Sequence, residues 1–247
     1  MTSKRPATIL RDALSPGDPL SLDEATRLVG GDRRVASRAL EYLVDRSDFR
    51  MVRKRLAVKA GAAADPHRLA ARITQTYALG YGTAWGLHAG AASIHTELLV
   101  TSPHRFTSFE FEGTLYRWAR PWRPDGLSRL SVGREFVWVT DVERTLVDCV
   151  RVPGNAGGAS ELLRSLPGYP RLQAEAVTRW VDTYNMASVA SRLGFLLQQA
   201  GRPFDESHLL LELERRRSRS PVYLDPTRTG GHLVVRWNVI VPDILTA

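Results

Sequence analysis

The amino-acid sequence predicts an α+β fold, in which an N-terminal winged helix-turn-helix is followed by a larger mixed α/β domain. Two observations lead to this prediction. Three helical patterns and a hairpin pattern follow one another within the first 60 residues, which is the element content of a winged helix. Helix and strand patterns then alternate irregularly toward the C-terminus, which is typical of a mixed α/β domain. The small-residue segment 59–64 lies between them, so we expect domains at 1–60 and 61–247.

Local signals justify the elements of the N-terminal domain. Ser21 and Glu24 have the spacing of a capping box, which starts a helix, and Gly30-Gly31 breaks that helix. Asp32 is then the expected N-cap of the next helix. The expected elements are a helix over 5–14, a helix after Ser21, a helix over 32–43 and a two-stranded hairpin over 49–58.

The helix expected at 32–43 has one apolar face and one polar face. At 100° per residue, its small and apolar side chains fall on one arc, which we expect to pack against the preceding helix. Those inward side chains are Ala36, Ala39, Leu40 and Leu43. The outward arc carries Arg33, Arg34, Ser37, Arg38 and Glu41.

The C-terminal domain is expected to mix helices with strands. Thr140 and Glu143 have capping-box spacing and are expected to start a helix, on which Arg144 and Asp148 would form an outward-facing i,i+4 pair. Cys149 falls on the inner face of that helix and is expected in the core. The other expected helices cover 66–76, 82–91, 159–166, 171–183, 186–200 and 209–216. The expected strands are 97–102, a hairpin over 107–120 that turns at Glu112-Gly113, 135–140 and 233–241.

Composition narrows the class of protein. The formal net charge is +8 and the isoelectric point is about 10.1, as expected of a nucleic-acid binder. Residues 1–60 hold 13 Lys and Arg against 8 Asp and Glu, and all three lysines lie there. The single cysteine excludes an internal disulfide and fits a reducing cytoplasm. No signal peptide or apolar membrane span is recognisable, so we expect a cytoplasmic protein without a membrane partner.

The arrangement of cations predicts binding to double-stranded DNA. A recognition helix reads base edges in the major groove from its first turns, and arginine pairs bidentately with guanine. A basic hairpin tip and a basic N-terminal arm would contact phosphates or the minor groove. The candidate DNA-binding residues are Lys4 and Arg5 on the arm, Arg33, Arg34, Ser37 and Arg38 on the helix, and Arg53, Lys54 and Arg55 on the hairpin.

The sequence offers little for catalysis. It has no phosphate-binding Gly-x-x-x-x-Gly-Lys loop and no Gly-x-Ser-x-Gly elbow, and its six histidines lack the spacing of a helical metal site. We therefore predict no catalytic residue, no metal and no cofactor. Glu110 and Glu112 share one face of a predicted strand, where a solvated surface is the ordinary interpretation and a nuclease metal site is the alternative.

Three segments of the C-terminal domain resemble a known family. Residues 83–88 (TAWGLH), 139–149 (VTDVERTLVDC) and 191–197 (SRLGFLL), with 224–226 (LDP) and 236–238 (RWN) downstream, resemble in order the AbiEi-type antitoxins of the abortive-infection E family. One departure is the hairpin, where Lys54-Arg55-Leu56 replaces the Arg-Gly-aromatic sequence that relatives often show. The resemblance implies an autorepressor that binds inverted repeats in its own promoter. It also implies an antitoxin that counteracts a nucleotidyltransferase-like toxin encoded beside it, without a stable complex being required.

Two alternatives remain open at this stage. In the first alternative, the chain is a nucleic-acid-processing enzyme, such as a nuclease, that a winged helix delivers to its substrate. Its candidate catalytic residues would be Glu110, Glu112 and segment 141–148. In the second alternative, the chain is a protein-interaction module whose residues 61–247 bind a toxin directly. An inverted-repeat operator is compatible with a monomer or a weak dimer.

Overall fold

The computed structural model describes residues 5–90, 96–201, 207–226 and 230–243. They form a mixed α/β fold with helices and several sheets, which agrees with the predicted α+β class. The chain divides into two compact units. The first unit comprises 1–79, 95–123 and 129–138, and the second comprises 80–94, 124–128 and 139–247. None of the helices in the described ranges combines the length and the apolar character that a membrane span requires.

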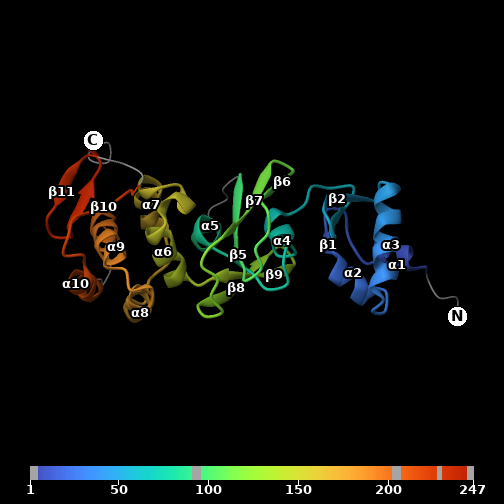
Figure 1. The fold of residues 1–247 in the computed structure, drawn as a ribbon, viewed down its shortest axis with the longest axis horizontal. Helices are drawn as coiled ribbons and strands as arrows, with labels where there is room; N and C mark the ends of the chain where they lie inside the picture. The colour runs from blue at the N-terminus through green and yellow to red at the C-terminus, as the bar shows by residue number, and fades with distance from the viewer. Residues whose placement is uncertain (1–4, 91–95, 202–206, 227–229, 244–247) are drawn as a thin grey trace. The chain divides into compact units, whose positions relative to one another are not determined.

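The first unit begins with three helices and a three-stranded sheet, drawn in blue in Figure 1. The strand order is β1-β3-β2, and both pairings are antiparallel. The predicted helices and hairpin are confirmed to within a few residues, whereas β1 was not predicted. The elements are α1 (Pro6–Asp12), β1 (Pro19–Ser21), α2 (Leu22–Leu28), α3 (Arg33–Asp45), β2 (Phe49–Arg53) and β3 (Leu56–Lys59).

The helix starts in this region follow from their caps. The Ser21 hydroxyl accepts a hydrogen bond from the Glu24 amide, and the Glu24 carboxylate accepts one from the Ser21 amide at 3.0 Å, so the predicted capping box is confirmed. The Asp32 carboxylate caps α3 by accepting from the amides of Arg34 and Val35. The inward face of α3 packs into a core whose buried members are Leu10, Leu20, Leu22, Ala25, Ala36, Ala39, Leu40, Leu43, Phe49 and Ala57.

The remainder of the first unit is built on a six-stranded sheet of order β6-β7-β5-β4-β9-β8. The predicted hairpin turn is confirmed at Glu112 and Gly113, whose φ angles of 48° and 76° suit a two-residue hairpin loop. Strands β4 and β8 were not predicted, and α4 is shorter than the expected 66–76. The elements are α4 (Pro66–Ala70), β4 (Ala78–Leu79), β5 (Glu97–Thr101), β6 (Phe109–Phe111), β7 (Thr114–Ala119), β8 (Leu127–Val132) and β9 (Glu135–Thr140).

The second unit is mainly helical and ends in a small three-stranded sheet of order β10-β12-β11. The single strand predicted at 233–241 is wrong: Val234 and Val239 pair across two antiparallel strands, and the chain reverses at Asn238, whose φ is 50°. The elements are α5 (Tyr81–Ala89), α6 (Val142–Arg151), α7 (Ala159–Ser165), α8 (Ala174–Tyr184), α9 (Ala187–Gln199), α10 (Ser207–Arg216), β10 (Val222–Tyr223), β11 (His232–Val234) and β12 (Val239–Val241).

Two expectations about α6 are wrong. Asp141, not Thr140, is the N-cap, and its carboxylate accepts from the Arg144 amide at 2.7 Å. The Glu143 carboxylate instead accepts from the Gln173 amide at 2.9 Å. Arg144 and Asp148 are 0% and 1% exposed rather than outward-facing. The helix is buried on every side between Glu143 and Val150, and Cys149 lies in the core as expected.

His88, in α5, should make the stability of the protein depend on pH. Burial lowers its pKa from the usual 6.5, against the opposing effect of the Thr140 carbonyl oxygen, 2.7 Å from Nε2. The folded protein therefore holds a neutral ring where the unfolded chain binds a proton. Stability is complete above the unfolded pKa and is lost as the pH falls. We expect the free energy of unfolding to decrease between about pH 7 and pH 5, measured by urea denaturation.

The variant His88→Gln removes this titration and should flatten the pH dependence. His104→Gln, which changes an exposed histidine, is the matched control and should leave the dependence intact. Equal pH dependence in both variants would show that another group carries it.

Candidate nucleic-acid interface

Helix α3 presents a cationic surface along its N-terminal half. Arg34 and Arg38 are exposed and lie one helical turn apart on the face opposite the buried residues. Glu41 and Asp45 continue the same face toward the C-terminus. The charge of this face therefore changes from positive to negative along the helix, and its first two turns attract an anion.

Two other predicted residues of α3 already have partners. The Arg33 guanidinium lies 2.5 Å from the Asp23 carboxylate, and its side chain is 49% exposed. A hydrogen bond from Gln75, with a second from Arg33, lowers the pKa of Asp23, so this carboxylate is charged at neutral pH. The Ser37 hydroxyl donates to Glu41 at 2.9 Å. A DNA contact by Arg33 or Ser37 would therefore include or displace these partners.

The hairpin tip separates the three predicted basic residues into two groups. Lys54 and Arg55 are exposed in the turn between β2 and β3, where Arg55 has a φ of 71°. Arg53 is partly buried, with its guanidinium carbon 5.7 Å and 5.1 Å from the ring centres of Phe106 and Phe109. Sequence reasoning placed Arg53 on DNA, whereas its aromatic contacts are with the six-stranded-sheet portion of the same unit.

The predicted N-terminal arm is described only at its end. Arg5 is exposed directly before α1, and Lys4 lies outside the described residues. The described contacts do not bring Arg5 to the other predicted positions.

A cleft of about 900 Å³ brings four of the predicted residues together: Arg33, Arg53, Lys54 and Arg55. Arg34, Ser37 and Arg38 do not line it. Sequence reasoning missed three of its other lining residues, Arg27, Arg72 and Gln75, because no local pattern connects α2 or residues 71–75 with the hairpin. The full lining is Ser21 to Glu24, Thr26, Arg27, Arg33, Arg53 to Leu56 and Ala71 to Gln75.

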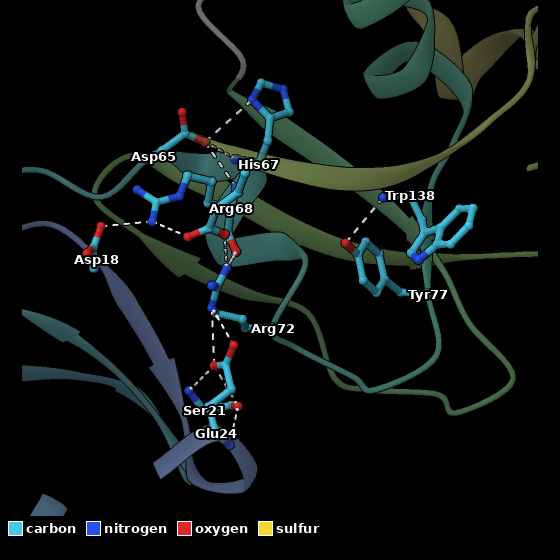
Figure 2. A network of polar contacts seen from close by, with 10 residues as sticks. Asp18, Ser21, Glu24, Asp65, His67, Arg68, Arg72, Tyr77 and Trp138 are labelled. Carbon is cyan, nitrogen blue, oxygen red and sulfur yellow. Dashed lines mark hydrogen bonds and ion pairs between the residues drawn. The ribbon is translucent and has the colours of Figure 1, made fainter. Parts of the chain in front are cut away.

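Beside this cleft, a network of ion pairs holds the N-terminal elements against α4 and β9 (Figure 2). Arg68 contacts Asp18 at 2.8 Å and also pairs with Glu135. Arg72 contacts Glu24 at 3.1 Å and Glu135 at 2.9 Å. Burial opposes ionisation of Glu135, but the hydrogen bonds from the two arginines outweigh it and lower the pKa of that carboxyl. Glu135 is therefore ionised at neutral pH.

Of the two carboxylates considered for a metal site, one already has partners within the first unit. Glu112 lies in the β6–β7 turn, pairs with Arg50 and accepts from the Ala64 amide at 2.8 Å. Glu110 lies on β6 and is exposed. Within the described ranges, no group of three or more His, Cys, Asp or Glu side chains is placed to hold a metal ion.

These contacts extend the first unit beyond the expected boundary at residue 60. Asp18, Glu24 and Arg50, all within 1–60, have partners at positions 68, 72 and 112. The compact unit accordingly includes residues on both sides of the segment 59–64.

Comparisons with known proteins identify a similar fold. No protein-family model matches the sequence, and no curated protein matches it. Among solved structures, the crystal structure of the RV2827C protein from Mycobacterium tuberculosis is similar, with a TM-score of 0.63 and 15% sequence identity. The similarity covers 97% of this chain and 92% of that chain. At this identity, the likeness concerns the fold alone.

Proposed function

We propose that residues 1–60 act as a winged helix-turn-helix that binds double-stranded DNA in a sequence-specific manner. In this proposal α3 is the recognition helix, and the β2–β3 hairpin is the wing. The observation that carries the proposal is the pair of exposed arginines, Arg34 and Arg38, on the first turns of α3. Side chains at these positions of a recognition helix reach base edges in the major groove. Lys54 and Arg55, exposed at the hairpin tip, would contact the phosphate backbone.

The order of the elements supports this proposal. Helix α2, the short break at Gly30-Gly31 and helix α3 succeed one another, and the β2–β3 hairpin with its basic turn follows and pairs with β1, which precedes α2. The capped start of α3 at Asp32 fixes the direction of its first turn. This arrangement lets one rigid body present a helix to the major groove and a hairpin to the adjacent backbone.

We further propose that the protein is the transcriptional autorepressor and antitoxin of a toxin–antitoxin operon. This part rests on the resemblance of segments 83–88, 139–149 and 191–197 to AbiEi-type antitoxins. Its partners would be inverted repeats in its own promoter and a nucleotidyltransferase-like toxin, with no enzymatic activity of its own. Repression of a reporter gene placed behind the protein's own promoter tests the repressor role. Relief of the growth arrest caused by the neighbouring gene tests the antitoxin role.

The decisive experiment measures DNA binding of the full chain by fluorescence anisotropy. The two duplexes are the region upstream of its own gene and a scrambled duplex of the same composition, at two salt concentrations. We expect Arg34→Ala and Arg38→Ala each to weaken binding to the upstream duplex about 5- to 150-fold, because a bidentate arginine–guanine contact is worth about 1–3 kcal/mol. Binding to the scrambled duplex should change less.

A matched control removes the same charge elsewhere. Arg171 and Arg179 are exposed residues of the second unit, so the double variant Arg171→Ala/Arg179→Ala should leave discrimination between the two duplexes unchanged. Equal affinity of the unmodified protein for both duplexes would contradict sequence-specific recognition and leave only a generic basic surface.

A further inference from the structure

The cleft that borders the hairpin has more cations than its carboxylates neutralise. Arg27, Lys54 and Arg55 line it and are exposed. Among the described residues, none of these three forms an ion pair. The carboxylates of the lining are Asp23 and Glu24, and both are engaged by other side chains.

Both carboxylates of the lining are engaged by other side chains, so a surplus of positive charge faces the cleft. Asp23 accepts from Arg33 and from Gln75, the latter at 2.6 Å. Glu24 accepts from the Ser21 amide and from Arg72. Of the three exposed cations, Arg55 also acts electrostatically on Asp23, but the two acids together leave a surplus of positive charge in the cleft. The cleft therefore favours an anion with more than one negative charge.

The lining of the cleft also includes uncharged side chains. Ile73 contributes apolar area, whereas Leu22 and Leu56 are 6% and 2% exposed, and the hydroxyls of Thr26 and Thr74 donate to the carbonyls of Leu22 and Thr76. A volume of about 900 Å³ lies within the range of ligand pockets, roughly 300–1,000 Å³. A cleft of this size has room for a nucleoside beside the phosphates.

We propose that this cleft binds the phosphate groups of a nucleotide, with Arg27, Lys54 and Arg55 as its anion-binding side chains. These phosphates have two sources, a free nucleoside polyphosphate or the backbone of bound DNA. The first source is independent of the proposed function, whereas the second rests on it. A free nucleotide in the cleft would occupy Lys54 and Arg55 and so compete with DNA for the hairpin.

The experiment uses the full chain and isothermal titration calorimetry with three probes: ATP without metal, adenosine and sodium tripolyphosphate. A free-nucleotide site predicts binding of ATP, weaker binding of tripolyphosphate and no detectable binding of adenosine. The variant Arg27→Ala/Lys54→Ala changes two exposed side chains and should weaken ATP binding at least about tenfold. Circular dichroism of the variant verifies that it folds.

A second pair of variants separates this inference from DNA recognition. Arg34→Ala/Arg38→Ala removes cations that do not line the cleft, so ATP binding should be unchanged while discrimination between duplexes is lost. Arg171→Ala/Arg179→Ala is the charge-matched control and should alter neither measurement.

Each outcome is decisive. Loss of ATP binding in Arg27→Ala/Lys54→Ala alone assigns the cleft to a free nucleotide. Absence of ATP binding, with DNA affinity weakened by Arg27→Ala but not by Arg171→Ala, assigns it to backbone phosphates. ATP binding that all three double variants retain would overturn the proposal, as would an Arg27→Ala variant that affects neither ligand. Failure of the duplex measurements alone would count against the DNA-binding function and leave the free-nucleotide site standing.

Discussion

Replacing Arg144 by alanine is expected to lower the free energy of unfolding by about 3–5 kcal/mol, the cost of leaving a buried charge without its partner. Arg144 is 0% exposed, and its Nε lies 3.4 Å from the Asp148 carboxylate, which is itself 1% exposed. Its Nη1 donates to the Asp125 carbonyl at 2.6 Å, and its guanidinium carbon lies 5.5 Å from the Trp180 ring centre. Alanine would remove all three contacts and leave Asp148 with Arg151 as its remaining ion-pair partner.

Urea denaturation of the full chain measures this effect. Arg164→Ala is the matched control, because that side chain is 76% exposed and its ion-pair partner Glu161 is 41% exposed. Surface changes of that kind stay within about 0.5 kcal/mol. The double variant Arg144→Met/Asp148→Leu replaces both charges by apolar groups and should recover most of the loss. A loss in Arg144→Ala no larger than in Arg164→Ala would show that the buried pair is not important for stability.

The second large effect is expected at Trp237, whose replacement by alanine should cost about 3–5 kcal/mol. The indole is 0% exposed, and its Nε1 donates to Gln198 at 2.7 Å. The ring fits against Gly194 of α9 so closely that a Cβ built on Gly194 would lie 2.1 Å from a ring carbon. Removing the ring therefore opens a large cavity where the helix surface has no side chain to fill it.

The close approach also predicts coupling between the two positions. Gly194→Ala alone should destabilise the protein by about 1–3 kcal/mol through overpacking. The carbon atoms that would collide belong to the six-membered ring of the indole, so Trp237→Phe should make room for the added methyl group. We expect Gly194→Ala/Trp237→Phe to lose less stability than the sum of the single variants, measured by a double-mutant cycle. Simple additivity would contradict the close packing of this ring on α9.

Sequence reasoning succeeded where the determinants are local and failed where two local signals compete. Ser21 and Glu24 form the expected capping box because the neighbouring residues offer no better cap. At the start of α6, the same pattern at Thr140 loses to Asp141, whose carboxylate caps the helix, while the Thr140 hydroxyl hydrogen bonds to Thr145. A capping pattern therefore predicts that a helix begins there, and packing decides which residue serves as the cap.

The outward placement of Arg144 and Asp148 failed for a different reason. A polar residue in a helical pattern is normally assigned to the solvent face, but α6 is buried on all sides. Its arginine and aspartate neutralise each other in the interior, and neither periodicity nor spacing distinguishes this case from an exposed pair. Only the positions of Asp125 and Trp180, which are distant in sequence, reveal it.

The candidate interface was partly predictable. The outward face of α3 follows from helical periodicity, and the positions of Arg34 and Arg38 agree with it. The aromatic contacts of Arg53 with Phe106 and Phe109, and the cleft next to the hairpin, depend on chain segments brought together over more than 15 residues of separation. No pattern within one sequence indicates such contacts, so the proposed anion-binding role of Arg27 could not be predicted.

The ion pairs of Asp18, Glu24 and Arg50 have a consequence for the order of events on the ribosome. The core of the N-terminal elements uses residues up to Ala57, so it can assemble early in translation. Its carboxylates at 18 and 24 gain their arginine partners at 68 and 72 soon afterwards, but those arginines gain Glu135, and Arg50 gains Glu112, only later. At about 5–20 residues per second, several seconds separate these events. During that interval we expect the helix-and-hairpin element to lack the ion pairs that Glu112 and Glu135 later complete.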